Sequence, residues 1–127
     1  MSILSNVLAV GVGAAFGAIA RWLLGIWLNQ AASTLPWGTL AANLVGAYLI
    51  GLALGCFLLF PETPGWLKLL VTTGFLGGLT TFSTYSAETV GLIERGQVLS
   101  AIAYSGLSLL GALLFTGLGL WTVSAVR

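Results

Sequence analysis

The chain has 127 residues, of which 58% are hydrophobic and 6% are charged, and its formal net charge is +1. A soluble globular domain carries about 25% charged residues, so this composition and a mean hydropathy of +1.08 indicate an integral membrane protein. The sequence contains no His and no Asp, and its three Glu residues are far apart. We therefore expect no catalytic triad, carboxylate pair or metal cluster and no enzyme activity. The small net charge predicts no nucleic-acid partner.

Four long apolar stretches run through the chain, each near the roughly 20 residues that a helix needs to cross the hydrocarbon core. Short connections containing Pro, Gly and charged residues separate them. The first stretch has no charged start and no clear cleavage site, so we expect it to remain in the mature protein. The sequence predicts an all-α membrane protein with a single four-helix domain over residues 1–127. The predicted spans cover residues 3–28, 37–60, 66–93 and 98–123.

The positive charges are balanced between the two membrane faces that these spans define. Lys68 and Arg127 fall on the side of the termini, whereas Arg95 falls on the other side and Arg21 near it. Because an excess of Lys and Arg fixes orientation, two against two specifies the topology weakly. Two oppositely inserted copies could then pair about a two-fold axis in the membrane plane.

The second and fourth spans each carry isolated polar groups. Asn43 is the strongly polar residue in the middle of the second span; its amide either donates to a transported ion or makes an interhelical hydrogen bond, worth about 0.6 kcal/mol on average. On the fourth span, Tyr104 and Ser108 are four residues apart and form a narrow hydroxyl stripe. Such hydroxyls either line a path or bond their own backbone.

The third span is densest in polar residues: five of the ten residues in the segment 77–86 are Ser or Thr, and two adjacent glycines precede two adjacent threonines there. Glycine and hydroxyl residues make a poor helix interior, so we predict a helix break midway along this span. Backbone carbonyls freed at such a break commonly coordinate cations, and two breaks in an antiparallel dimer could form an oxygen cage. The alternative is a kink that only relieves packing.

Aromatic and charged side chains accompany this break. Phe82 and Tyr85 are three residues apart and share a helix face, so their ring edges could solvate an anion or simply pack. We expect Arg21 and Glu88 to lie at the membrane boundary opposite the termini and to face each other. Both are either functional charges of a transport path or side chains that reach the interface.

These residues resemble a known family, the small Fluc (CrcB) fluoride channels of bacterial membranes, over essentially the whole chain. The resemblance rests on Gly-Ala-x-x-Arg-Trp at residues 17–22 and on Trp-Gly-Thr-Leu-x-x-Asn-Leu-x-Gly at residues 37–46. The most specific motif is Thr-Gly-Phe-Leu-Gly-Gly-Leu-Thr-Thr-Phe-Ser-Thr at residues 73–84.

The resemblance implies an antiparallel, dual-topology homodimer in the bacterial inner membrane, with two pores that conduct fluoride passively out of the cell and relieve its toxicity. It also implies a structural sodium ion at the dimer interface, bound by the backbone carbonyls of Gly77 and Thr80. By the same resemblance, Arg21 and Glu88 belong to the vestibule. The residues matched to the fluoride path are Asn43, Phe82, Thr84, Tyr85, Tyr104 and Ser108.

One residue departs from the pattern, because Tyr85 carries a hydroxyl where the family often has Phe. That hydroxyl could donate to the ion, bond a neighbour or narrow the path.

Two other functions are open. A small dual-topology multidrug exporter also uses four helices, but it needs a carboxylate deep in the first span, where only Arg21 is charged. A helical scaffold that transports nothing would use Gly and hydroxyl residues for packing alone, and would tolerate apolar residues at Asn43 and Phe82.

Overall fold

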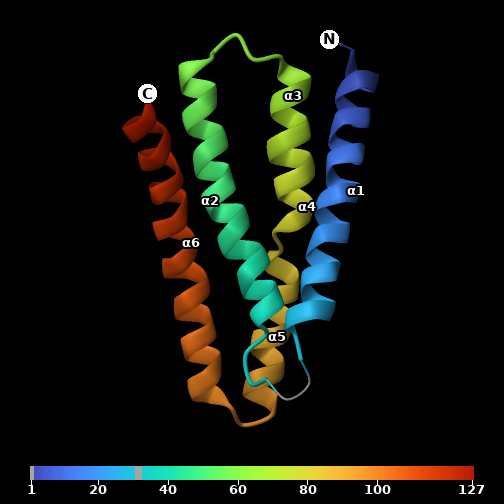
Figure 1. Ribbon diagram of the computed structural model, residues 1–127. Helices are drawn as coiled ribbons and strands as arrows, with labels where there is room; N and C mark the ends of the chain where they lie inside the picture. Colours follow the sequence, from blue (N-terminus) through green and yellow to red (C-terminus); the bar gives the residue numbers. More distant parts are fainter. Residues whose placement is uncertain (1, 31–32) are drawn as a thin grey trace.

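A computed structural model describes residues 2–30 and 33–127, and every regular element in that part of the chain is a helix. Three helices are long and apolar enough to cross a membrane: α1 (Ile3–Leu28), α2 (Trp37–Leu59) and α6 (Val98–Val126). Their bounds lie within a few residues of the first, second and fourth predicted spans. The all-α fold class is therefore confirmed (Figure 1).

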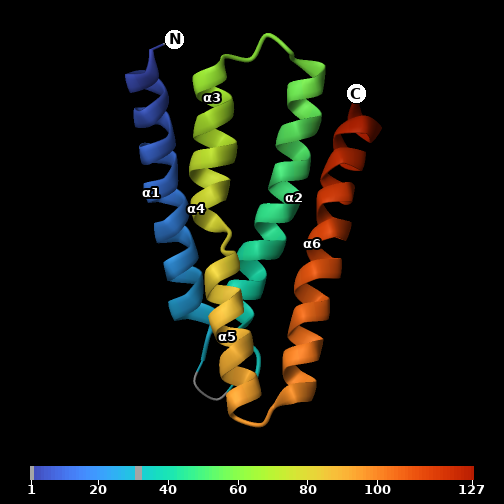
Figure 2. The ribbon, with the colours of Figure 1, turned by 180° about the vertical axis from the view of Figure 1, so that it is seen from behind.

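The region of the third predicted span is divided into four segments. A short α3 (Gly65–Leu69), a π-helical η1 (Leu70–Leu76) and a single turn α4 (Gly77–Leu79) precede the break, and α5 (Phe82–Glu94) follows it. Seen from either side, α5 continues below α4 in nearly the same direction (Figures 1 and 2). With 15 helical residues before it and 13 after it, the break lies midway along this region (5, 7 and 3 residues in α3, η1 and α4).

Two residues form the break. Thr80 (φ −93°, ψ 152°) and Thr81 (φ −151°, ψ 123°) have extended backbones, whereas the preceding Gly77 is still helical. The sequence signal was correct about the presence of a break, but the threonines and not the glycines leave the helix. Of the two glycines, Gly78 serves close packing instead.

Close contact with α1 explains why position 78 is occupied by glycine. A Cβ atom at Gly78 would lie 2.5 Å from the carbonyl oxygen of Ala14 and 2.9 Å from the nitrogen of Ala18. Small residues allow helix backbones to approach in this way in membrane proteins. The half of the third region that precedes the break is thus seated directly on the backbone of α1.

The α2 and α6 helices form the other close pair. A Cβ atom at Gly119 of α6 would collide with the carbonyl oxygen of Tyr48 in α2, and the Tyr48 hydroxyl is 2.9 Å from the hydroxyl of Thr122. Large apolar side chains face outward from the bundle, including Ile3 at 83% exposure and Leu99 at 80%. Such continuous apolar surfaces are typical of contact with lipid or with another chain.

Candidate functional site

The break between α4 and α5 is the centre of the candidate site. At its first residue, the nitrogen of Thr80 donates to the carbonyl of Leu76 at 3.0 Å, and its hydroxyl donates to the same oxygen at 2.8 Å. At its second residue, the Thr81 hydroxyl accepts from the nitrogen of Thr84 at 3.1 Å. Thr81 is thereby the N-cap of α5, a position that favours Thr because its oxygen satisfies an otherwise free N–H group.

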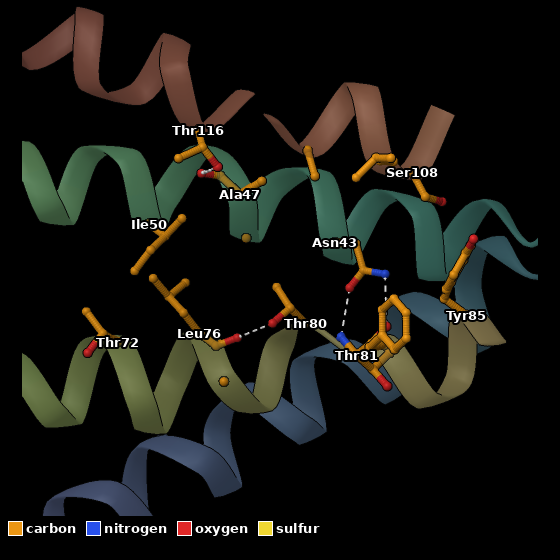
Figure 3. A pocket seen from close by; sticks show the side chains of 15 residues that line it. Asn43, Ala47, Ile50, Thr72, Leu76, Thr80, Thr81, Tyr85, Ser108 and Thr116 are labelled. Atoms are coloured by element: carbon orange, nitrogen blue, oxygen red, sulfur yellow. Dashed lines mark hydrogen bonds between the residues drawn. The ribbon is translucent and has the colours of Figure 1, made fainter. Parts of the chain in front are cut away.

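Asn43 of α2 holds the extended backbone of Thr81 on both sides of the residue. Its Oδ1 accepts from the nitrogen of Thr81 at 2.8 Å, and its Nδ2 donates to the carbonyl of Thr81 at 3.1 Å (Figure 3). The interhelical hydrogen bond considered for Asn43 is therefore present. The amide nitrogen has two hydrogens, so one N–H remains for another acceptor.

Several carbonyls near the break have lost their helical partners. In a continuous helix the carbonyl of Gly77 would accept from the nitrogen of Thr81, but that nitrogen donates to Asn43. Within the described residues, no backbone or side-chain donor bonds the carbonyls of Gly77 and Thr80. These are the two oxygen atoms that the resemblance assigns to sodium.

Arg21 of α1 bonds the backbone beside the break. Its Nε donates to the carbonyl of Gly78 at 3.0 Å, so the guanidinium lies beside the break, midway along the third region. A freed carbonyl at this depth needs a donor, and Arg21 supplies it.

Glu88 does not face Arg21, contrary to expectation. One carboxylate oxygen accepts from the hydroxyl of Thr39 at 2.9 Å, and the other accepts from the hydroxyl of Tyr104 at 2.9 Å. Tyr104 is completely buried, so its hydroxyl has to find a partner inside the protein. Glu88 therefore joins α2, α5 and α6 through two hydroxyl groups.

The hydroxyl of Tyr85 has a structural partner. It donates to the hydroxyl of Ser105 at 2.8 Å, which links α5 to α6. The Tyr85 ring lies 5.4 Å from the rings of both Phe82 and Tyr104, with tilts of 47° and 50°. Phe82 is at the outer end of this row and is 81% exposed. Ser105 was not predicted as a site residue, although its position beside Tyr104 was a signal.

A pocket of about 670 Å³ opens beside the break, between α2, α6 and the third region (Figure 3). None of its lining residues is charged. The Ser108 hydroxyl oxygen is buried and has no hydrogen-bond partner among the described residues, whereas the Thr116 hydroxyl donates to the carbonyl of Ala47 at 3.1 Å. The predicted residues that line this pocket are Asn43, Gly77, Thr80, Phe82, Tyr85 and Ser108.

A second pocket, of about 650 Å³, is lined by α5 and by the connection between α1 and α2. Among its lining residues are Thr84 and Glu88, with Arg95 as the cationic side chain. Arg21 lines neither pocket, and neither does Tyr104. The predicted site residues therefore fall into three groups: those that line the first pocket, those that line the second pocket, and Arg21 and Tyr104, which line neither. Thr116 and Arg95 were not predicted as site residues.

No cluster of three or more His, Cys, Asp or Glu side chains occurs in residues 2–30 and 33–127. Backbone carbonyls are suitable ligands for a hard cation, and those of Gly77 and Thr80 have no other partner.

Comparison with known proteins gives a consistent result over nearly the whole chain. The sequence model of the family described as CrcB-like protein, Camphor Resistance (CrcB), matches residues 8–120. The fluoride-specific ion channel FluC of Bordetella petrii is 60% identical over 122 residues, covering 96% of this chain and 94% of the relative. The proteins of the same name from Chromohalobacter salexigens and Tolumonas auensis are 49% and 48% identical, covering 96% and 98% of this chain and 92% and 98% of the relatives.

Proposed function

Because the chain belongs to the CrcB-like protein family, we propose that it is a fluoride-selective ion channel. It conducts fluoride passively out of the cell across the bacterial inner membrane, as a multi-pass protein, and so relieves fluoride toxicity. The observation that carries this proposal is the identity of 60% to a fluoride-specific channel along 96% of the chain. The uncharged pocket beside the break supplies the matching chemistry.

Fluoride is small and strongly hydrated, so a narrow path has to replace its water with several donors. The pocket offers the second N–H of the Asn43 amide, the unpaired hydroxyl of Ser108 and the ring edge of Phe82. A hydroxyl rotates to suit its partner, so Ser108 can turn toward an ion. Thr84 and Glu88 line the second pocket and form the approach from the other end, with Tyr104 supporting Glu88 from behind.

We infer that two copies assemble as an antiparallel, dual-topology homodimer with two pores, in contact with membrane lipid. In this arrangement α3 to α5 together form the third of four crossings in chain order. The proposal is supported by the pocket, which opens to the outside of a single chain, and by Phe82, which is 81% exposed although it flanks the break. A second copy would cover both features.

We also propose that a structural sodium ion binds at the interface between the two breaks. The free carbonyls of Gly77 and Thr80 fit this role, because two chains related by a two-fold axis would supply four neutral oxygens. The ion would hold the two breaks together. The residues that line the pocket would carry the fluoride.

Fluoride efflux from liposomes containing purified protein tests the function, with a fluoride electrode as the detector and chloride efflux as the comparison. Rapid fluoride release with little chloride release, lost in Asn43→Ala and in Phe82→Ile, is the expected result. Absence of fluoride release from folded protein would refute the channel. Retained release in both variants would place the path elsewhere.

Two further measurements address the finer proposals. Cross-linking and tagged-terminus accessibility should show a dimer with termini on both faces of the membrane, whereas a single orientation would refute dual topology. Efflux measured after exchanging sodium for a large organic cation should decrease if the sodium ion is structural. Unchanged efflux without sodium would refute that site.

A further inference from the structure

We propose that Asn29 is a positioning residue, which turns the hydroxyl of Thr39 toward Glu88 and so holds that carboxylate at the side of the second pocket. Asn29 is the C-cap of α1 and lines this pocket together with Glu88. The inference deepens the proposed channel function and rests on it, because Glu88 lies on the proposed approach of fluoride. Three observations support it: the missing cap of α2, the directions of the hydrogen bonds, and the packing around Gly38.

The first turn of α2 has no cap of its own. The first N–H groups of a helix lack partners within that helix, and the residue before α2 is Pro36, whose side chain makes no capping bond. Asn29 supplies the cap from the end of the preceding helix, because its Oδ1 accepts from the nitrogen of Gly38 at 2.6 Å. Asn is among the residues best suited to cap a helix. One side chain therefore joins the end of α1 to the start of α2.

The directions of the neighbouring hydrogen bonds follow from this contact. The backbone N–H of Gly38 can only donate, so the amide atom that faces it is the oxygen. The other amide atom is the nitrogen, which donates to the hydroxyl oxygen of Thr39 at 3.3 Å and cannot accept from it. The Thr39 hydroxyl has one hydrogen, and it donates this hydrogen to the Oε2 of Glu88 at 2.9 Å. Asn29 thus sets the direction in which Thr39 donates.

The packing of α2 against α1 leaves little freedom to these groups. A Cβ atom at Gly38 would lie 2.5 Å from the carbonyl oxygen of Leu24 and 2.9 Å from the Oδ1 of Asn29. Glycine at this position lets the two helices approach closely enough for the Gly38 N–H to reach the amide. Thr39, the next residue, is only 4% exposed. Its hydroxyl is therefore held between Asn29 and Glu88.

Both carboxylate oxygens of Glu88 accept a hydroxyl hydrogen in this arrangement. Tyr104 donates to Oε1 and Thr39 donates to Oε2, each at 2.9 Å. Hydrogen bonds to a charged acceptor are stronger than those between neutral groups, so the carboxylate is held toward α2 and α6. A carboxylate released from Thr39 would be free to turn into the second pocket, where its charge would repel fluoride. Asn29 thereby acts on the approach of fluoride through Thr39 and Glu88.

The variant Asn29→Asp separates the two functions of the amide. It keeps an oxygen to cap Gly38 but replaces the N–H donor by a second acceptor, so that Thr39 has one hydrogen for two carboxylates. Gln30→Glu is the matched control, because Gln30 is exposed, lines the same pocket and would add the same charge there. Thr39→Val removes the hydroxyl through which Asn29 acts. Each variant is measured by fluoride efflux from liposomes at high salt, where the effect of an added charge is screened.

We expect Asn29→Asp to release fluoride about tenfold more slowly than Gln30→Glu. In proteins that also carry Thr39→Val, the two substitutions should differ by less than about twofold, because no hydroxyl is left to orient. Equal efflux from Asn29→Asp and Gln30→Glu would overturn the proposal, and this comparison alone decides if Thr39→Val does not fold. A tenfold difference that persists with Thr39→Val would overturn it as well, because Asn29 would then act without Thr39.

Hydrogen exchange at the Gly38 amide gives a measurement that does not depend on fluoride. By NMR of the protein in detergent micelles, Gly38 should exchange as slowly in Asn29→Asp as in the wild type, and about tenfold faster in Asn29→Ala, which loses the cap. Slow efflux from Asn29→Asp together with fast exchange at Gly38 would assign the effect to the lost cap and refute the positioning role. Absence of efflux from the wild type would refute the channel itself, whereas slow exchange at Gly38 would still report the cap.

Discussion

Asn43 provides the sharpest test of how the break is held. Asn43→Ala removes the two hydrogen bonds to Thr81, of 2.8 Å and 3.1 Å, and leaves a backbone N–H and a carbonyl without their partner. An unsatisfied buried polar group costs about 1–3 kcal/mol, whereas an average interhelical side-chain bond in a membrane protein contributes about 0.6 kcal/mol. Two bonds therefore bracket the loss between about 1 and 6 kcal/mol.

We expect Asn43→Ala to lower the free energy of unfolding by about 2 kcal/mol or more and to reduce fluoride efflux by at least about tenfold. The stability is measured by titration with a denaturing detergent, and the efflux with a fluoride electrode. Asn6→Ala is the matched control, because the Oδ1 of Asn6 is buried and accepts no hydrogen bond from residues 2–30 or 33–127. Its stability should change by less than about 0.5 kcal/mol.

Two results would contradict this reasoning. If Asn43→Ala were as stable as Asn6→Ala while losing efflux, the amide would act only on the ion and would not hold the break. If stability fell while efflux stayed at the wild-type rate, the geometry of Thr81 would not control conduction.

The other predictions concern single contacts. Tyr85→Phe removes the 2.8 Å bond to Ser105 and should cost about 1 kcal/mol of stability while efflux stays within about twofold; a tenfold loss would make the hydroxyl part of the path. Ser108→Ala should leave stability unchanged to within about 0.5 kcal/mol, since its oxygen has no partner, and slow efflux; unchanged efflux would remove Ser108 from the path. Gly78→Ala should destabilise by about 1–3 kcal/mol, whereas the control Gly11→Ala, whose Cβ would meet nothing within 4 Å, should not.

The sequence was sufficient for features that depend on neighbouring residues. Hydrophobic runs and their Pro and Gly boundaries predicted the helical class, and the glycines and threonines of residues 77–81 predicted the break. Both signals are local, because propensity and hydropathy act over a few turns of helix. The π-helical form of η1 had no such signal. In that segment the Thr72 hydroxyl donates to the carbonyl of Lys68 at 2.7 Å. The hydroxyl thus competes with backbone N–H groups for a helical carbonyl, and only the structure shows this.

Such local patterns do not predict which residues on different helices form hydrogen bonds with each other. Asn43 and Thr81 are 38 residues apart, and Arg21 and Gly78 are 57 residues apart. Which donor reaches which freed carbonyl depends on how closely α1 and α2 approach the break, and that distance is determined by packing. The expected pairing of Arg21 with Glu88 failed for this reason: charge complementarity suggested it, but backbone oxygens and hydroxyls lie nearer to each side chain.

The contacts of the two partly buried charges, Arg21 and Glu88, connect the fold to the proposed transport. Arg21 is engaged by a backbone carbonyl, and Glu88 is engaged by the hydroxyls of Thr39 and Tyr104. A free guanidinium in the pocket would bind fluoride too tightly for release, and a free carboxylate would repel it. Both charges are held by structural contacts, and no charged residue lines the pocket beside the break. A permeating anion requires weak, replaceable donors, and the uncharged lining of this pocket matches the fluoride path that we propose.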